Sequence, residues 1–212
     1  ISSAVARRDK DIVMSISCLG LKLALIIGLP CAVGLFVLAR PILAMLYPVL
    51  TDAQLTLAAD LMHTASIGVV FLSLVQSMTG VIQGLGKPNV PLFNLFIGFL
   101  LKVVSLLILM NIPSINIQGA SVSTVICYAF AGLADTVYAL RRARIELNLW
   151  DVVLKPLISS LAMGAMVYMC HDFVARMGHE TIAVIGSVFL GVCVYAVLAV
   201  YLKMFSKEEL SY

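Results

Sequence analysis

The segment VPLFNLFIGFLLKVVSLLILMN, residues 90–111, decides the structural class of this protein. It contains one charged side chain, Lys102, and is otherwise almost entirely apolar. A helix of about 20 apolar residues crosses the roughly 30 Å hydrocarbon core of a bilayer. The segment therefore predicts a transmembrane helix.

Five further apolar runs have a similar length and spacing, at residues 13–39, 55–83, 117–140, 152–171 and 181–204. Hydrophobic residues make up 62% of the chain, and the mean hydropathy is +1.08. Charged residues make up 12%, about half the ~25% of a soluble domain. We therefore predict an all-α, polytopic transmembrane helical bundle of six spans in the cell membrane.

Basic residues are concentrated on one side of the predicted topology. With residues 1–12 as a cytoplasmic loop, six spans return residues 205–212 to the cytoplasm as a tail. Residues 141–151 form the longest loop on that side. Short cytoplasmic loops carry an excess of Lys and Arg, so both ends of the chain are predicted to be cytoplasmic. The outer side holds Arg40 and Arg176, and the cytoplasmic side holds Arg7, Arg8, Lys10, Lys87, Arg141, Arg142, Arg144, Lys155, Lys203 and Lys207.

The chain lacks the motifs of a metal site, a disulfide framework or an enzyme. Its five cysteines stand singly within hydrophobic runs. Residues 84–88, GLGKP, miss the spacing of a phosphate-binding loop and have proline where Ser or Thr would bind magnesium. We predict no enzymatic activity, no metal, no cofactor and no nucleic-acid partner. Membrane lipids are the expected contacts of the basic clusters.

Polar and small residues recur along the spans at helical spacing. A helix that contacts only lipid needs no polar atoms, and each buried polar atom costs free energy unless it finds a partner. The resulting stripes are Ser66, Ser73, Gln76, Ser77, Gly80, Gln83 and Gly84 in the second span, Asn94, Gly98, Lys102 and Ser105 in the third, and Ser121, Thr124, Tyr128, Gly132, Asp135 and Tyr138 in the fourth.

Two explanations of these stripes remain open. Small residues permit close helix approach, and Ser, Thr, Asn and Gln form hydrogen bonds between helices. Alternatively, the stripes line a water-filled cavity. Helix packing is favoured for the Ser and Gly positions, whereas Gln76, Gln83 and Asn94 are candidates for the cavity.

The charged groups within the spans are the strongest candidates for a substrate site. Lys102 is about 14–20 Å from either interface at 1.5 Å per residue, a distance that strains snorkelling. A cavity or pathway is therefore favoured over a structural salt bridge or a neutral buried amine. Lys22 is nearer the cytoplasmic boundary, where snorkelling competes with a cavity role. Asp135 is six residues from Arg141, which favours an interfacial ion pair, although Asp135 is also the obvious partner for a lysine.

The first span contains a predicted helix kink. Gly28, Pro30 and Gly34 lie within it, and proline removes a backbone hydrogen bond and bends a helix.

Several segments resemble one family of transporters. They are IGLPCAVGL at 27–35, LARPI at 38–42, QSMTGVIQGLGKP at 76–88, PLFN at 91–94, IP at 112–113 and NIQGA at 116–120. In order and spacing, they resemble the multidrug/oligosaccharidyl-lipid/polysaccharide exporter superfamily. Within it they are similar to the stage V sporulation protein B branch of polysaccharide biosynthesis proteins, which is related to the lipid II flippase.

This resemblance implies a fold and a function. It implies the C-terminal part of a two-lobe transporter of about fourteen spans, with the N-terminal spans upstream as partners. Residues 13–140 would be four helices of the second lobe, and residues 152–204 two extra helices. The substrate would be a lipid-linked sugar on polyprenyl pyrophosphate, or a peptidoglycan precursor, moved by alternating access. Two alternatives stay open: a cation-coupled multidrug exporter of the same superfamily, and a non-transporting scaffold for cell-envelope or spore assembly.

Overall fold

The computed structural model describes residues 10–112, 117–143, 150–176, 180–202 and 204. Within these ranges every regular element is helical, and six helices are long and apolar enough to cross a membrane. This confirms the predicted fold class. The elements are α2 (Lys10–Val37), α3 (Ala39–Leu46), α4 (Asp52–Gly84), α5 (Asn89–Met110), α6 (Gln118–Ala143), the π-helical turn η1 (Trp150–Leu154), α7 (Lys155–Ala175) and α8 (Glu180–Tyr201).

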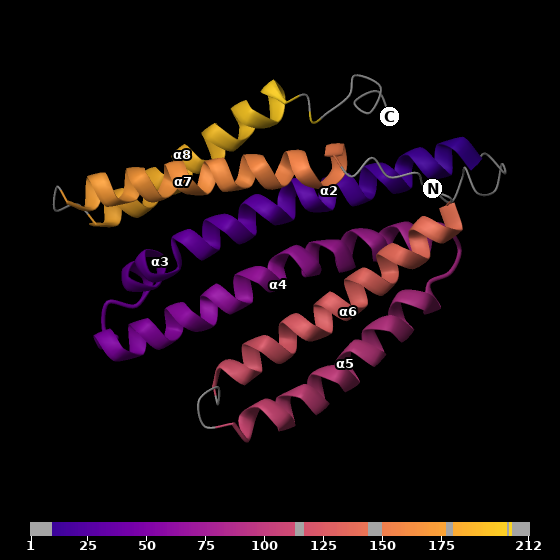
Figure 1. Ribbon diagram of the computed structural model, residues 1–212, viewed down its shortest axis with the longest axis horizontal. Coiled ribbons are helices and arrows are strands. Elements are labelled where there is room, and N and C mark those ends of the chain that lie inside the picture. Colours follow the sequence, from indigo (N-terminus) through magenta and orange to yellow (C-terminus); the bar gives the residue numbers. More distant parts are fainter. Residues whose placement is uncertain (1–9, 113–116, 144–149, 177–179, 203, 205–212) are drawn as a thin grey trace.

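Helix α2 lies between two groups of helices. On one side, α4 packs against α2, α6 packs against α4, and α5 packs against α6 at the edge of the bundle (Figure 1). On the other side, α7 packs along α2, and α8 packs against α7 and touches α3. The two C-terminal helices therefore contact the rest of the bundle chiefly through α2 and α3.

The structure separates the basic residues as the topology predicts, where they are described. Lys87 joins α4 to α5, Arg141 and Arg142 end α6, and Lys155 begins α7, all toward the end of the bundle where α2 begins (Figure 1). We name this the basic end. Which end faces the cytoplasm stays a prediction. Five of the basic residues lie outside the described ranges: Arg7, Arg8, Arg144, Lys203 and Lys207.

The first span ends earlier than predicted. It stops at Val37, and the chain turns at Leu38 into α3, a short helix between the first and second predicted spans that was not predicted. Helix α4 then begins at a capping box, in which Thr51 and Gln54 satisfy each other's backbone donors. The T-x-x-Q spacing was present in the sequence and could have located this boundary.

Serine hydroxyls and glycines hold α2 against α4. The Ser73 Oγ donates to the Ala24 carbonyl at 3.0 Å, and the Ser77 Oγ donates to the Gly20 carbonyl at 2.6 Å. A Cβ at Gly20 would lie 3.0 Å from the Val81 side chain, and one at Gly28 would overlap Ser73. These contacts confirm the helix-packing interpretation for the two serines and make Gly28 a close-approach residue.

Proline 30 leaves a backbone carbonyl that a different helix satisfies. Helix α2 continues through Pro30, whose missing N–H would have bonded to the Ile26 carbonyl. The Tyr195 hydroxyl of α8 donates to this carbonyl at 2.7 Å. An unsatisfied carbonyl inside a bilayer is costly, so this bond permits the proline and ties α8 to α2.

Removing the Tyr195 hydroxyl is expected to destabilise the protein. The loss of stability should be larger when residue 30 is proline. Tyr195→Phe should lower the free energy of unfolding by ~0.5–2 kcal/mol, the range for a hydrogen bond between membrane helices. Pro30→Ala restores the N–H, so Tyr195→Phe should then cost much less. Denaturation of the purified protein in detergent, run as a double-mutant cycle, measures this coupling.

Ser160 supplies the matched control. It interacts with the same Tyr195 hydroxyl and donates to the Pro156 carbonyl. Ser160→Ala should have the same effect with or without Pro30. Strictly additive effects of Pro30→Ala and Tyr195→Phe would contradict the assignment.

Candidate functional site

The structure brings two of the predicted site residues together at the α5–α6 contact. The Asn94 Nδ2 of α5 donates to the Asp135 Oδ1 of α6 at 2.7 Å, and Asp135 is only 1% exposed. We expected an interfacial ion pair with Arg141. That expectation was wrong because the side chain of Asp135 turns into the contact between helices, where an amide is its hydrogen-bond donor.

The buried carboxyl of Asp135 is only partly satisfied. Thr79 of α4 lies close enough to interact with it, but the Oδ2 atom meets no donor at hydrogen-bonding geometry. A carboxyl in such surroundings pays a large desolvation cost in its charged form. The position therefore suits a group that takes up a proton or another small cation.

Lys102 lies on the face of α5 that packs against α6. A Cβ added to Gly98 on this face would be 2.9 Å from the Cys127 carbonyl, and Lys102 lies within electrostatic range of Cys127. Its side chain is partly exposed at the edge of the contact. A partly exposed ammonium near the middle of a span is costly in contact with hydrocarbon, so we expect this edge to face water or protein.

The predicted polar stripe of α4 divides between two faces. Ser73 and Ser77 turn toward α2, whereas Gln76 and Gln83 are exposed. Gly80 lies between them, and a Cβ there would meet nothing within 4 Å. Gly80 is therefore not a packing glycine. Its helical spacing from both glutamines places the three on one open stripe.

Helix α6 extends this open stripe. Ser121, Thr124 and Tyr128 line a groove of about 320 Å³ together with residues of α4 that include Leu72. Leu72 is one helical turn before Gln76, so the groove continues the glutamine stripe. We name the combined surface the polar wall; its residues are Gln76, Gly80 and Gln83 of α4 and Ser121, Thr124 and Tyr128 of α6. We expect Lys102, at the edge of the α5–α6 contact, to adjoin it.

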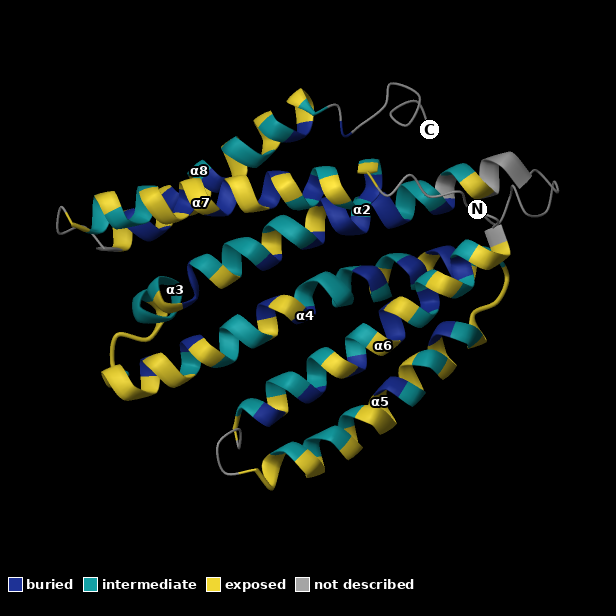
Figure 2. Cartoon of the chain, in the orientation of Figure 1, coloured by how far each residue is buried: buried dark blue, intermediate teal, exposed yellow. Residues whose placement is uncertain are grey.

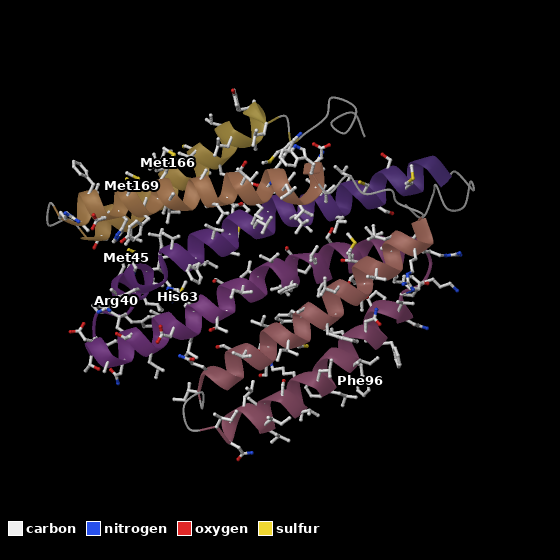
Figure 3. All side chains as sticks on the ribbon, in the orientation of Figure 1. Arg40, Met45, His63, Phe96, Met166 and Met169 are labelled. Atoms are coloured by element: carbon white, nitrogen blue, oxygen red, sulfur yellow. The ribbon has the colours of Figure 1, made fainter. Side chains whose placement is uncertain are left out.

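The opposite face of the same helices is apolar. Leu133 is nine residues from Thr124, which is half a turn of rotation on a helix, and it is 52% exposed. Exposed residues of α5 continue this surface, among them Phe96 on the edge helix (Figures 2 and 3). An exposed surface rich in Phe and Leu side chains suits contact with lipid tails. We therefore expect the polar wall to be the side that does not face lipid.

The remaining predicted residues lie away from the polar wall. Lys22 is buried, 7% exposed, on α2, so snorkelling to the interface does not describe its position. Pro30 and Gly34 line a mostly apolar groove between α2, α7 and α8. Among the described residues, no group of three His, Cys, Asp or Glu side chains could hold a metal ion.

Comparison with known proteins identifies the family. The MatE family model matches residues 1–108, just over half of the chain. The chain belongs to the MatE family. It is 28% identical over its whole length to the uncharacterized membrane protein YabM of Bacillus subtilis (strain 168). Its fold is similar to that of the lipid II flippase MurJ in an inward closed conformation, with a TM-score of 0.68, 19% identity and 95% of this chain covered.

These similarities have definite limits. The MatE-family chain spans 39% of the length of YabM and 41% of the MurJ chain. The likeness to MurJ establishes the fold, and the superfamily resemblance read from the sequence is confirmed at the level of MatE.

The polar wall predicts a pattern of water access. In a background without the five natural cysteines, Gln76→Cys and Tyr128→Cys should react with a membrane-impermeant maleimide in reconstituted full-length protein. Leu133→Cys and Phe130→Cys, both on the apolar face, should not react, because a thiolate forms only in contact with water. Equal labelling of both sets would show that the two faces have the same surroundings.

Proposed function

We propose that this chain forms part of a membrane flippase that moves a lipid-linked oligosaccharide or peptidoglycan precursor by alternating access. Helices α2, α4, α5 and α6 would belong to the second lobe of the transporter, and α7 and α8 would be two extra helices. Both ends of the chain would be cytoplasmic. Family membership and the MurJ-like fold support this proposal.

The observation that carries the proposal is the polar wall and its mid-span lysine. A transporter that moves a large anionic headgroup needs a hydrated surface across the bilayer, and Gln76, Gln83 and Tyr128 provide hydrogen-bonding groups. Lys102 adds a positive charge that suits a pyrophosphate. The apolar opposite face would contact lipid, while the wall would face the upstream spans.

We also propose membership of the stage V sporulation protein B branch. The supporting residues are the QSMTGVIQGLGKP segment at 76–88 and the PLFN segment at 91–94. They contribute Gln76 and Gln83 to the polar wall and Asn94 to the buried pair. A sporulation role would make the substrate a precursor of the spore envelope.

Rescue of cells depleted of their lipid II flippase tests the proposal. Full-length wild-type protein should restore growth, and Lys102→Met should lower transport of the lipid-linked precursor by about 10–100-fold, the value of one charged hydrogen bond. Lys87→Met, an exposed lysine between α4 and α5, is the matched control and should behave as wild type. Protein level and membrane insertion are measured for each variant.

Three results would count against the flippase. Full rescue by normally inserted Lys102→Met would remove the essential role of Lys102. Failure of wild type to rescue, combined with lower sensitivity to cationic dyes, would favour the multidrug exporter. If every polar-wall substitution leaves the cellular phenotype unchanged, a scaffold role is favoured instead.

The burial of Asp135 favours a second candidate, the cation-coupled multidrug exporter. Such an exporter needs a carboxylate within the membrane that binds a proton or sodium ion. Asp135, with one oxygen held by Asn94 and the other unpartnered, fits that requirement.

Dependence on an ion gradient tests this candidate. If Asp135 couples transport, Asp135→Asn should abolish the response of drug export to imposed proton and sodium gradients in vesicles. Asp52→Asn, at a 96% exposed carboxylate near the opposite end, should preserve the response. Unchanged gradient dependence in correctly folded Asp135→Asn would exclude Asp135 as the coupling group.

A further inference from the structure

A further groove lies between α5 and α6, on the apolar face and at the basic end of the bundle. Its volume is about 700 Å³. Arg141 and Arg142 stand at one end of it, next to Tyr138, and the remaining lining is largely apolar: Val90, Phe130, Leu133, Ala134 and Val137, with Asn94 at the α5 side. We propose that this groove binds one anionic phospholipid from the membrane leaflet at the basic end.

The charge at the groove's mouth points to a phosphate. Arg141 and Arg142 are both exposed, in the last turn of α6. Among the described residues, the ion pairs involve other side chains, and neither guanidinium has a carboxylate within ion-pair distance. Asp135, the acid nearest to them along α6, is buried and bonded to Asn94. Two adjacent guanidinium groups can bind a phosphate through paired hydrogen bonds.

The length of the apolar part matches one leaflet. The groove extends along α6 from Arg141 to Phe130, eleven residues or about 16 Å of helix. Half of a roughly 30 Å hydrocarbon core is about 15 Å. A phosphate held at Arg141 and Arg142 would therefore leave a fatty-acyl chain beside Phe130, Leu133 and Val137. Tyr138 lies between the two regions, where an amphipathic ring suits the interface.

The position of the groove separates it from the proposed transport path. Leu133 in the groove and Thr124 in the polar wall lie on opposite sides of α6. A lipid bound at Leu133 has direct access from the bilayer and leaves the polar wall free. This favours a resident phospholipid over the transported substrate, and the inference does not depend on what the protein transports.

Photo-crosslinking tests the site in the full-length protein. The protein is reconstituted in phosphatidylcholine vesicles with a trace of phosphatidylglycerol carrying a photoreactive acyl chain. Crosslinks should map to α5 and α6 within the groove. Since each arginine near an anionic lipid contributes about 5-fold in affinity, Arg141→Gln with Arg142→Gln should reduce crosslinking about 30-fold. Arg40→Gln with Arg176→Gln, at the other end, is the matched control and should change nothing.

A second variant separates groove binding from surface charge. Ala134→Trp keeps both arginines but fills the groove, and it should also abolish crosslinking there. Secondary structure and monodispersity in detergent verify that each variant is folded. Excess inorganic phosphate should not compete, because it cannot occupy the apolar part of the groove.

Three outcomes would overturn the inference. The first is equal crosslinking by the matching phosphatidylcholine probe, which would indicate ordinary contact with bulk lipid. The second is unchanged crosslinking in both folded variants. The third is stronger competition by a polyprenyl phosphate than by unlabelled phosphatidylglycerol, which would assign the groove to the transported lipid.

Discussion

The bundle depends on the requirement that every backbone carbonyl inside a bilayer has a donor. Helix α2 meets this requirement with help from its neighbours. Pro30 frees the Ile26 carbonyl, which Tyr195 of α8 satisfies, and the carbonyls of Gly20 and Ala24 accept additional bonds from α4. The same bonds hold two groups of helices on either side of α2. If α2 kinks at Pro30 as the sequence predicts, these bonds would couple the kink to both groups.

The bundle's two faces are chemically different although both are exposed in this chain. One exposes glutamines, hydroxyls and a lysine, and the other exposes Phe, Leu and Val side chains. In water, the exposed apolar face would be the unusual one. In a bilayer, the exposed polar face is the unusual one, because lipid tails offer no hydrogen bonds. The polar wall is therefore the surface that needs a partner, whether water, substrate or the rest of the transporter.

The sequence was sufficient to predict the six spans because length and hydropathy are local properties. It also predicted which residues share a stripe, but not which neighbour each stripe meets. Gln76 and Ser77 are adjacent in the chain, yet one is open and the other bonds to Gly20. Only the packing of the helices determines which of the two side chains is exposed and which is bonded. The distance of Asp135 from Arg141 along the chain was equally misleading, because rotation about the helix axis, not depth, determines its surroundings. Helix α3 was not predicted, because it has only eight residues, begins with Ala39, Arg40 and Pro41, and is stabilised by its contacts with α4 and α8.

The charges of the α5–α6 hairpin show why pairing within the membrane could not be inferred from residue types alone. Asp135 and Lys102 are the natural ion pair by charge, but Asp135 is bonded to Asn94, eight residues before Lys102. Eight residues correspond to about 12 Å along a helix, so the ammonium and the carboxyl lie at different depths of the same contact. An ion pair would have neutralised both groups and left neither for function. Held apart, the carboxyl retains an unpartnered oxygen and the lysine retains its charge at the edge of the polar wall. The hairpin thus keeps two chemically distinct polar groups in the membrane, one suited to a small cation and the other to an anionic headgroup.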